Sequence, residues 1–132
     1  MPDETTACQE TWDGVCIETF VGVTAREPFQ FTEEDDDGVE QNQDISGWDL
    51  VIVVTEGPPE SPGTEVRSFT LANGGIERDD DEATFTLIVD DEAAEEIDPG
   101  RYSFRAELYV TGETVPFDIP FRGWFNHRRS GR

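Results

Sequence analysis

Residues 98–110 read DPGRYSFRAELYV, and this stretch decides the fold class. Hydrophobic and polar side chains alternate along it with a period of two, which is the spacing of a strand that buries one face. A turn at Gly112 separates it from a second alternating run at 115–121, so the two runs predict a β-hairpin. The buried face of the first strand is expected to carry Tyr102, Phe104, Ala106, Leu108 and Val110.

Two prolines distinguish the second strand of this hairpin. Pro116 and Pro120 lie four residues apart, so their missing N–H groups fall on the same side of the strand. A strand with such a side cannot pair fully there, which predicts a position at a sheet edge or a corner. The inward face of this strand is assigned to Val115, Phe117, Ile119 and Phe121.

The rest of the chain predicts further short strands separated by turns. Residues 48–55 are apolar on both faces, which indicates a central strand, and residues 85–89 alternate again. Weaker strands are expected at 17–23, 28–32 and 66–71, which brings the total to about seven. One helix of about two turns is expected, capped by Asp90 or Asp91 and ended after Ile97 by the sequence Asp-Pro-Gly.

A tyrosine placed directly after a short helical turn resembles the immunoglobulin-like fold, in which a tyrosine near the start of strand F hydrogen-bonds back across the E–F corner. The resemblance implies an all-β, immunoglobulin-like antiparallel β-sandwich of about seven strands, with the short helix between strands E and F. Phe104 stands where antibody domains have their second cysteine, so no inter-sheet disulfide is implied. The residues expected to support this fold are Tyr102, Gly100 and Trp48.

A wider set of motifs extends over residues 26–125: REPFQF at 26–31, DDDG at 35–38, DISGW at 44–48, GGI at 74–76 and FRGWF at 121–125. Their order is similar to the small β-sandwich domains of tailed-virus structural proteins, such as the N-terminal domain of baseplate upper proteins and of minor tail or head-associated proteins. The resemblance implies a virion protein, assembled in the host cytoplasm. Such a protein binds other virion proteins, as a homo-oligomer or in multiple copies of a symmetric assembly.

The charge balance is extreme, with 31 acidic residues against nine basic residues, a net charge of −22 and no lysine. Exposed charges are screened within about 3 Å at 1 M salt, so such a surface suits a salt-rich compartment. A lysine-free acidic composition resembles proteins of extreme halophiles, and together with the motif order it implies a virus of haloarchaea. Nucleic acid and anionic membranes are not expected as partners, because like charge opposes the contacts that they need.

Two other functions are compatible with this composition. One is an acidic inhibitor that mimics the charge of DNA, and the other is a domain of a haloarchaeal surface protein. The N-terminus has no basic and apolar leader and no run of about 18 apolar residues occurs, so we expect synthesis and folding inside the cell.

Three parts are expected along the chain: an N-terminal arm at 1–15, the β-sandwich domain at 16–125 and a basic C-terminal tail at 126–132. Large aromatic rings and arginine guanidinium groups contribute much of the energy at protein interfaces. Arginine also pairs well with carboxylates on a neighbouring subunit. The expected partner-binding residues are Trp12, Trp124, Phe125, Arg128, Arg129 and Arg132.

Catalytic, metal and cofactor sites are not expected. The only histidine, His127, falls in the polar tail, far from Cys8 and Cys16, and the two cysteines are interpreted as small buried side chains or as a local disulfide. The acidic stretch 33–44 partly imitates a calcium loop, but flanking helices are not expected, so a solvated turn is the favoured interpretation. Its weak cation candidates are Asp35, Asp37 and Asp44.

Overall fold

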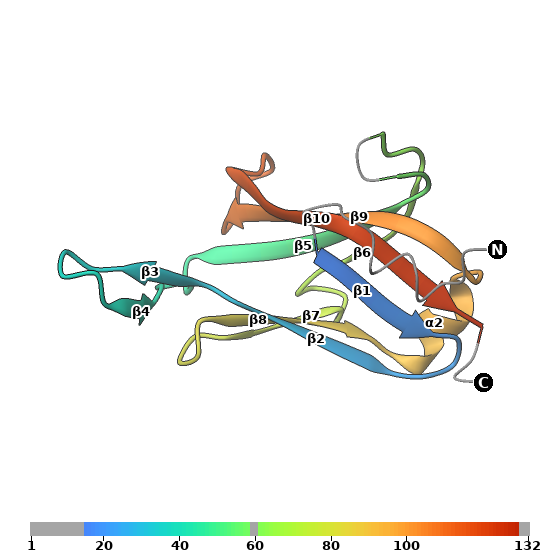
Figure 1. Cartoon of the computed structure of the whole chain (residues 1–132), viewed down its shortest axis with the longest axis horizontal. Helices are drawn as coiled ribbons and strands as arrows, with labels where there is room; N and C mark the ends of the chain where they lie inside the picture. The colour runs from blue at the N-terminus through green and yellow to red at the C-terminus, as the bar shows by residue number, and fades with distance from the viewer. Residues whose placement is uncertain (1–14, 59–60, 130–132) are drawn as a thin grey trace.

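The computed structural model describes residues 15–58 and 61–129, and their strands form two main layers (Figure 1). Sheet A has the strand order β1-β10-β9-β5-β6 and sheet B has the order β2-β8-β7. The predicted all-β class is confirmed, and the described residues contain the predicted short helix. Sheet A consists of β1 (Val15–Phe20), β10 (Asp118–Arg128), β9 (Gly100–Val110), β5 (Trp48–Thr55) and β6 (Glu65–Phe69); sheet B of β2 (Ala25–Gln30), β8 (Thr84–Val89) and β7 (Ile76–Asp79).

The core lies between the two sheets and is built by alternation along their strands. On β9, Phe104, Ala106 and Leu108 are buried, as the period of two predicts, and their register partners on β5 are buried as well. β5 also buries Val53 on its outer face, in agreement with its prediction as a central strand. The opposing layer fills the core with Phe29, Ile76, Phe85, Leu87 and Val89.

The described residues contain ten strands, where the sequence predicted about seven. The three additional strands are β7 and a separate two-stranded hairpin of β3 (Thr32–Glu34) and β4 (Glu40–Asn42). All six residues of β3 and β4 are exposed. Figure 1 shows this hairpin extending away from both sheets. Polar residues dominate it, so it has no hydrophobic face from which the sequence could predict a strand.

The expected alternation of the last strand is wrong in its first half. β10 begins at Asp118, and a register shift lies between Asp118 and Phe121, so the residues before it do not continue the inward face. Val115 and Phe117, predicted inward, are 73% and 49% exposed. Phe121 is partly buried against the core, and Phe125 and His127 are fully buried.

β10 lies between β9 and β1, but its described pairing with β1 begins at Gly123, after the stretch with Pro116 and Pro120 for which an edge or a corner was predicted. β1 pairs with β10 in parallel, whereas an antiparallel sandwich was expected. The described pairing runs from Gly123 to Arg128, and the residues that precede Val15 lie outside the described residues. A register shift between Asp118 and Phe121 interrupts the pairing with β9 around Pro120, whose nitrogen has no hydrogen to donate.

The helix α2 (Asp91–Glu96) connects β8 in sheet B to β9 in sheet A, as the sequence predicts. Asp90 is its N-cap, and its carboxylate accepts a hydrogen bond from the N–H of Ala93 at 2.8 Å. Ala93 and Ala94 bury the inner side of the helix against the core. The helix thus carries the chain from one layer to the other at the end where β9 begins.

Tyr102 closes the corner that follows this helix. Its hydroxyl donates a hydrogen bond to the carbonyl of Asp98 at 2.7 Å, and the ring is partly buried against the core. A Cβ added at Gly100 would lie 3.6 Å from the Tyr102 ring, an ordinary contact distance, so this packing does not itself require glycine. The corner fixes the position at which β9 enters sheet A.

We predict that Tyr102→Phe lowers the free energy of unfolding by about 1 kcal/mol, because the Asp98 carbonyl loses its side-chain donor. Urea titration followed by tryptophan fluorescence measures the difference. Tyr109→Phe is the control, since the Tyr109 hydroxyl bonds only to the Glu107 carboxylate on the outer face of sheet A. An equal loss of unfolding free energy in the two variants would show that the Tyr102 hydrogen bond has no special role in stability.

Candidate functional site

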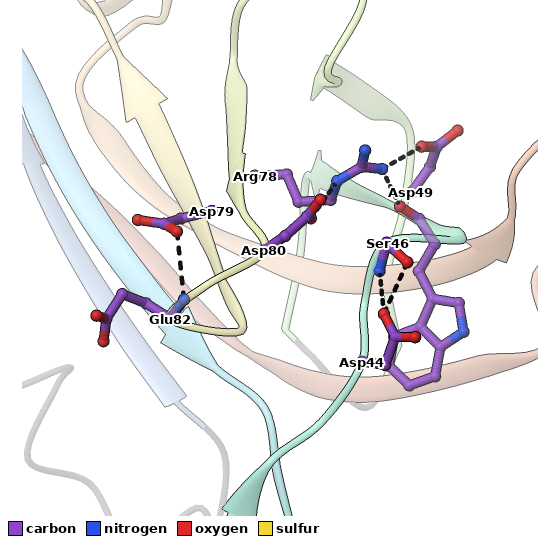
Figure 2. A network of polar contacts seen from close by, with 8 residues as sticks. Asp44, Ser46, Asp49, Arg78, Asp79, Asp80 and Glu82 are labelled. Atoms are coloured by element: carbon purple, nitrogen blue, oxygen red, sulfur yellow. Dashed lines mark hydrogen bonds and ion pairs between the residues drawn. The ribbon is translucent and has the colours of Figure 1, made fainter.

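The acidic turns use their carboxylates in local hydrogen bonds. Asp35 accepts the N–H groups of Val39 and Asp37, both at 2.9 Å, and the bond from Val39 is the largest cause that lowers its pKa. Asp44 accepts the hydroxyl and the N–H of Ser46, and these bonds lower the pKa of Asp44 in the same way (Figure 2). Asp37 lies at the tip of the β3–β4 hairpin. In the part of the chain that the structure describes, no three acidic, histidine or cysteine side chains are grouped to hold a metal ion.

Arg78 on β7 connects sheet B to the start of β5 in sheet A. Its Nη1 donates to the Trp48 carbonyl at 3.0 Å and lies 3.8 Å from an Asp49 carboxylate oxygen. Its Nε lies 2.9 Å from a carboxylate oxygen of Asp80, and Figure 2 shows the guanidinium between these acceptors. Asp79 in the same turn accepts the N–H of Glu82 at 3.2 Å. This network is therefore an inter-sheet clamp.

We expect Arg78→Gln to lower the free energy of unfolding by about 1–2 kcal/mol, because a hydrogen bond from a charged donor and two ion pairs are lost together. Urea titration is the measurement. Arg26→Gln on β2 is the matched control, since its ion pair with Glu77 is well exposed and should contribute less than about 0.5 kcal/mol. A smaller effect at Arg78 than at Arg26 would contradict the clamp.

Of the six sequence-predicted partner-binding residues, the structure describes four, and these differ in exposure. Phe125 is fully buried in the core, so its prediction as a contact residue is wrong. Trp124 is half-buried, and the Arg101 guanidinium lies over its ring at 4.2 Å. Arg128 lies at the end of β10, 3.9 Å from Glu18, and Arg129 is exposed beside it. Trp12 and Arg132 lie outside the described residues.

His127 is part of the core and not of a polar tail. β10 continues to Arg128, beyond the expected domain boundary at 125, and buries His127 completely. Its Nε2 donates to the Ala94 carbonyl at 2.8 Å, so Nδ1 accepts the hydroxyl of Thr19 at 2.7 Å. Burial holds the pKa of His127 below its ordinary value of 6.5, against the opposing effects of the Ala94 and Ile97 carbonyls. The imidazole connects β10 to β1 and to α2, and it is not placed to act on a substrate.

The depressed pKa of His127 predicts that stability falls as the pH drops below 6.5. The unfolded chain then takes up a proton that the folded chain does not, until the pH reaches the pKa of the folded state. Urea midpoints over this range measure the loss. Because the chain has one histidine, its imidazole NMR signal also reports the folded pKa without overlap. A folded pKa at or above 6.5 would contradict this account.

Four large apolar side chains are exposed at the end of β9, at the start of β10 and in the connection between them, and we refer to them as the loop cluster. One of them is well exposed and two others are close to half exposed. The Phe117 ring packs on Trp48 with 5.3 Å between ring centroids, and Trp48 in turn contacts Phe31 next to the core. Sequence reasoning missed this cluster, although Gly112, Pro116 and Pro120 were signals that the alternation is interrupted there. Its members are Val110 (49% exposed), Val115 (73%), Phe117 (49%) and Ile119 (38%).

Cys16 is disulfide-bonded, so the interpretation of the two cysteines as free buried thiols is wrong at this position. Cys8, the other cysteine of the sequence, lies outside the described residues. A cystine sulfur is not a thiolate ligand, and this excludes Cys16 from metal binding in this state.

Comparison with protein-family models and with curated proteins finds no match to this chain. The helix in the described ranges is too short to cross a membrane.

Proposed function

We propose that the chain is a non-enzymatic, immunoglobulin-like β-sandwich that acts by binding other proteins, as a multicopy structural subunit in the virion of a tailed virus of haloarchaea. The strand order supports the fold. With β9 as strand F, the β10-β9-β5 part of sheet A corresponds to G-F-C, and β2-β8-β7 corresponds to B-E-D. The hydrogen bond from Tyr102 to the Asp98 carbonyl corresponds to the tyrosine corner of such domains.

The loop cluster is the observation that carries the binding function. Large exposed apolar patches on soluble proteins often mark surfaces that bind a partner. The loop cluster occurs in a chain of net charge −22, and the Phe117–Trp48 contact holds part of it on a rigid strand. The sequence places only Glu113 and Asp118 as charged residues between Val110 and Ile119. This end of the molecule thus offers a partner an apolar contact with few charges to desolvate.

Solvent conditions favour this kind of contact. At about 1 M salt the screening length is about 3 Å, so charges attract a partner only at direct contact. Burial of apolar surface is not screened in this way, and excluded salts strengthen it. In a halophilic structural protein, an acidic surface would maintain solubility and a small apolar surface would bind the partner. The motif order over residues 26–125 supports its assignment to tailed-virus particles.

The proposal predicts that mass spectrometry of purified virions of the encoding virus detects the chain in multiple copies per particle. Val115→Glu should reduce its incorporation by at least about tenfold, because a charge at the centre of an apolar contact must be desolvated. Val23→Glu is the matched control, since it adds the same charge at a valine that is 52% exposed in the β1–β2 turn. Absence of the chain from virions would refute the proposal.

A further inference from the structure

Two of the nine arginines face each other on the outer face of sheet A. Arg105 on β9 and Arg122 on β10 are direct register partners. Like charges directly opposite each other in a sheet are destabilising. Arg105 is partly neutralised by Glu107, whose carboxylate lies 2.7 Å from the Arg105 Nε. Arg122 is exposed and forms no ion pair with any described residue. The chain has 31 acidic residues, yet the charge of Arg122 is not balanced by an ion pair with a described residue. An anionic group of a partner would stabilise the arginine pair.

The two arginines line a small notch on the outer face of sheet A. Its cavity has a volume of about 50 Å³ and is also lined by Thr55, Pro62, Ser103 and Phe104. The hydroxyls of Thr55 and Ser103 are buried and lie 2.7 Å apart. A water molecule takes about 30 Å³ in the liquid, so the notch accommodates a group of the size of a carboxylate. Guanidinium groups bind carboxylates in a bidentate geometry, and two of them are available here.

We propose that this arginine notch binds carboxylates of the β3–β4 hairpin of a second copy of the chain. The proposal deepens the multicopy role proposed above and names the surfaces that join the copies. Residues 32–42 hold six acidic side chains and no basic one. The hairpin projects from both sheets, as Figure 1 shows, so its tip is able to reach a neighbour. Asp36 and Asp37 lie at this tip, and both are exposed.

The hairpin tip is held in one conformation before it meets a partner. The Asp35 carboxylate accepts two backbone N–H groups of the turn, from Asp37 and Val39, and a third hydrogen bond from the Gln41 amide at 2.9 Å. A turn that is ordered in advance loses less conformational entropy when it binds. Asp35 therefore organises the tip, and Asp36 and Asp37 remain available for the two arginines.

Net charge determines how this contact depends on salt. Two chains of charge −22 repel each other at low ionic strength, and this repulsion acts over about 10 Å at 0.1 M salt. At 1 M salt the range falls to about 3 Å, which is still the length of a direct guanidinium–carboxylate bond. Association is therefore expected to strengthen as salt rises through this range, opposite to an ordinary ion pair. Because notch and hairpin are different surfaces, contacts between them can propagate head-to-tail into rings or filaments.

Sedimentation velocity of the purified full chain, over a concentration series at about 0.1 M and 1 M salt, tests the proposal. The parent chain should form higher oligomers at the higher salt. Arg122→Glu and the double variant Asp36→Arg/Asp37→Arg should each weaken association by at least about tenfold. Mixed together, these two variants should recover association, because the hairpin of the Arg122→Glu variant meets an intact notch and the reversed charges of the other two surfaces are also opposite.

Arg26→Glu is the control, because it makes the same charge change at an exposed arginine on β2 in the other sheet. It should associate like the parent chain. A parent that stays monomeric at both salt concentrations, or association that Arg122→Glu leaves unchanged, overturns the proposal. A monomeric parent that still enters virions would overturn the notch contact alone and leave the proposed virion role standing.

Discussion

β9 is hydrogen-bonded along its length to β5 on one side and to β10 on the other, and this double pairing places the arginine notch and leads into the loop cluster. Its inner face supplies Phe104, Ala106 and Leu108 to the core, so the strand cannot shift by one residue without exposing them. Its outer face carries Arg105 opposite Arg122, and its end leads into the loop cluster. The Tyr102 corner sets where the strand begins, and that position fixes the register with both neighbours.

Charge and hydrophobic burial have separate functions in this molecule. The acidic side chains concentrate in turns and on the β3–β4 hairpin, where they remain hydrated and do not disturb the core. Several arginines instead occupy defined positions in the fold. Arg78 crosses between the sheets, Arg101 covers the Trp124 ring, and Arg105 and Arg122 line the notch. A planar donor that is always charged is well suited to such positions, which explains how a lysine-free chain can still be tightly organised.

The C-terminal part shows how a sequence pattern can mislead. The run from Asn126 to Arg129 contains only polar side chains, which is typical of a solvated tail, yet Asn126 and His127 are completely buried. The tertiary structure compensates the polarity of His127, which bonds to Thr19 on β1 and to the α2 carbonyl of Ala94. Both partners are remote in sequence, so no local pattern could indicate them. The same holds for β1, whose parallel pairing with β10 joins residues 108 positions apart.

The sequence by itself determined the all-β class, the core strands β5, β8 and β9, the capped helix and the acidic, lysine-free surface. These follow from local rules, namely side-chain alternation, capping chemistry and composition. Only the tertiary structure decided which apolar residues are exposed in the loop cluster, because a register shift at Asp118 breaks the alternation on which their prediction rested. It also decided that Arg105 and Arg122 meet, since two residues 17 positions apart become neighbours only when their strands pair in one particular register.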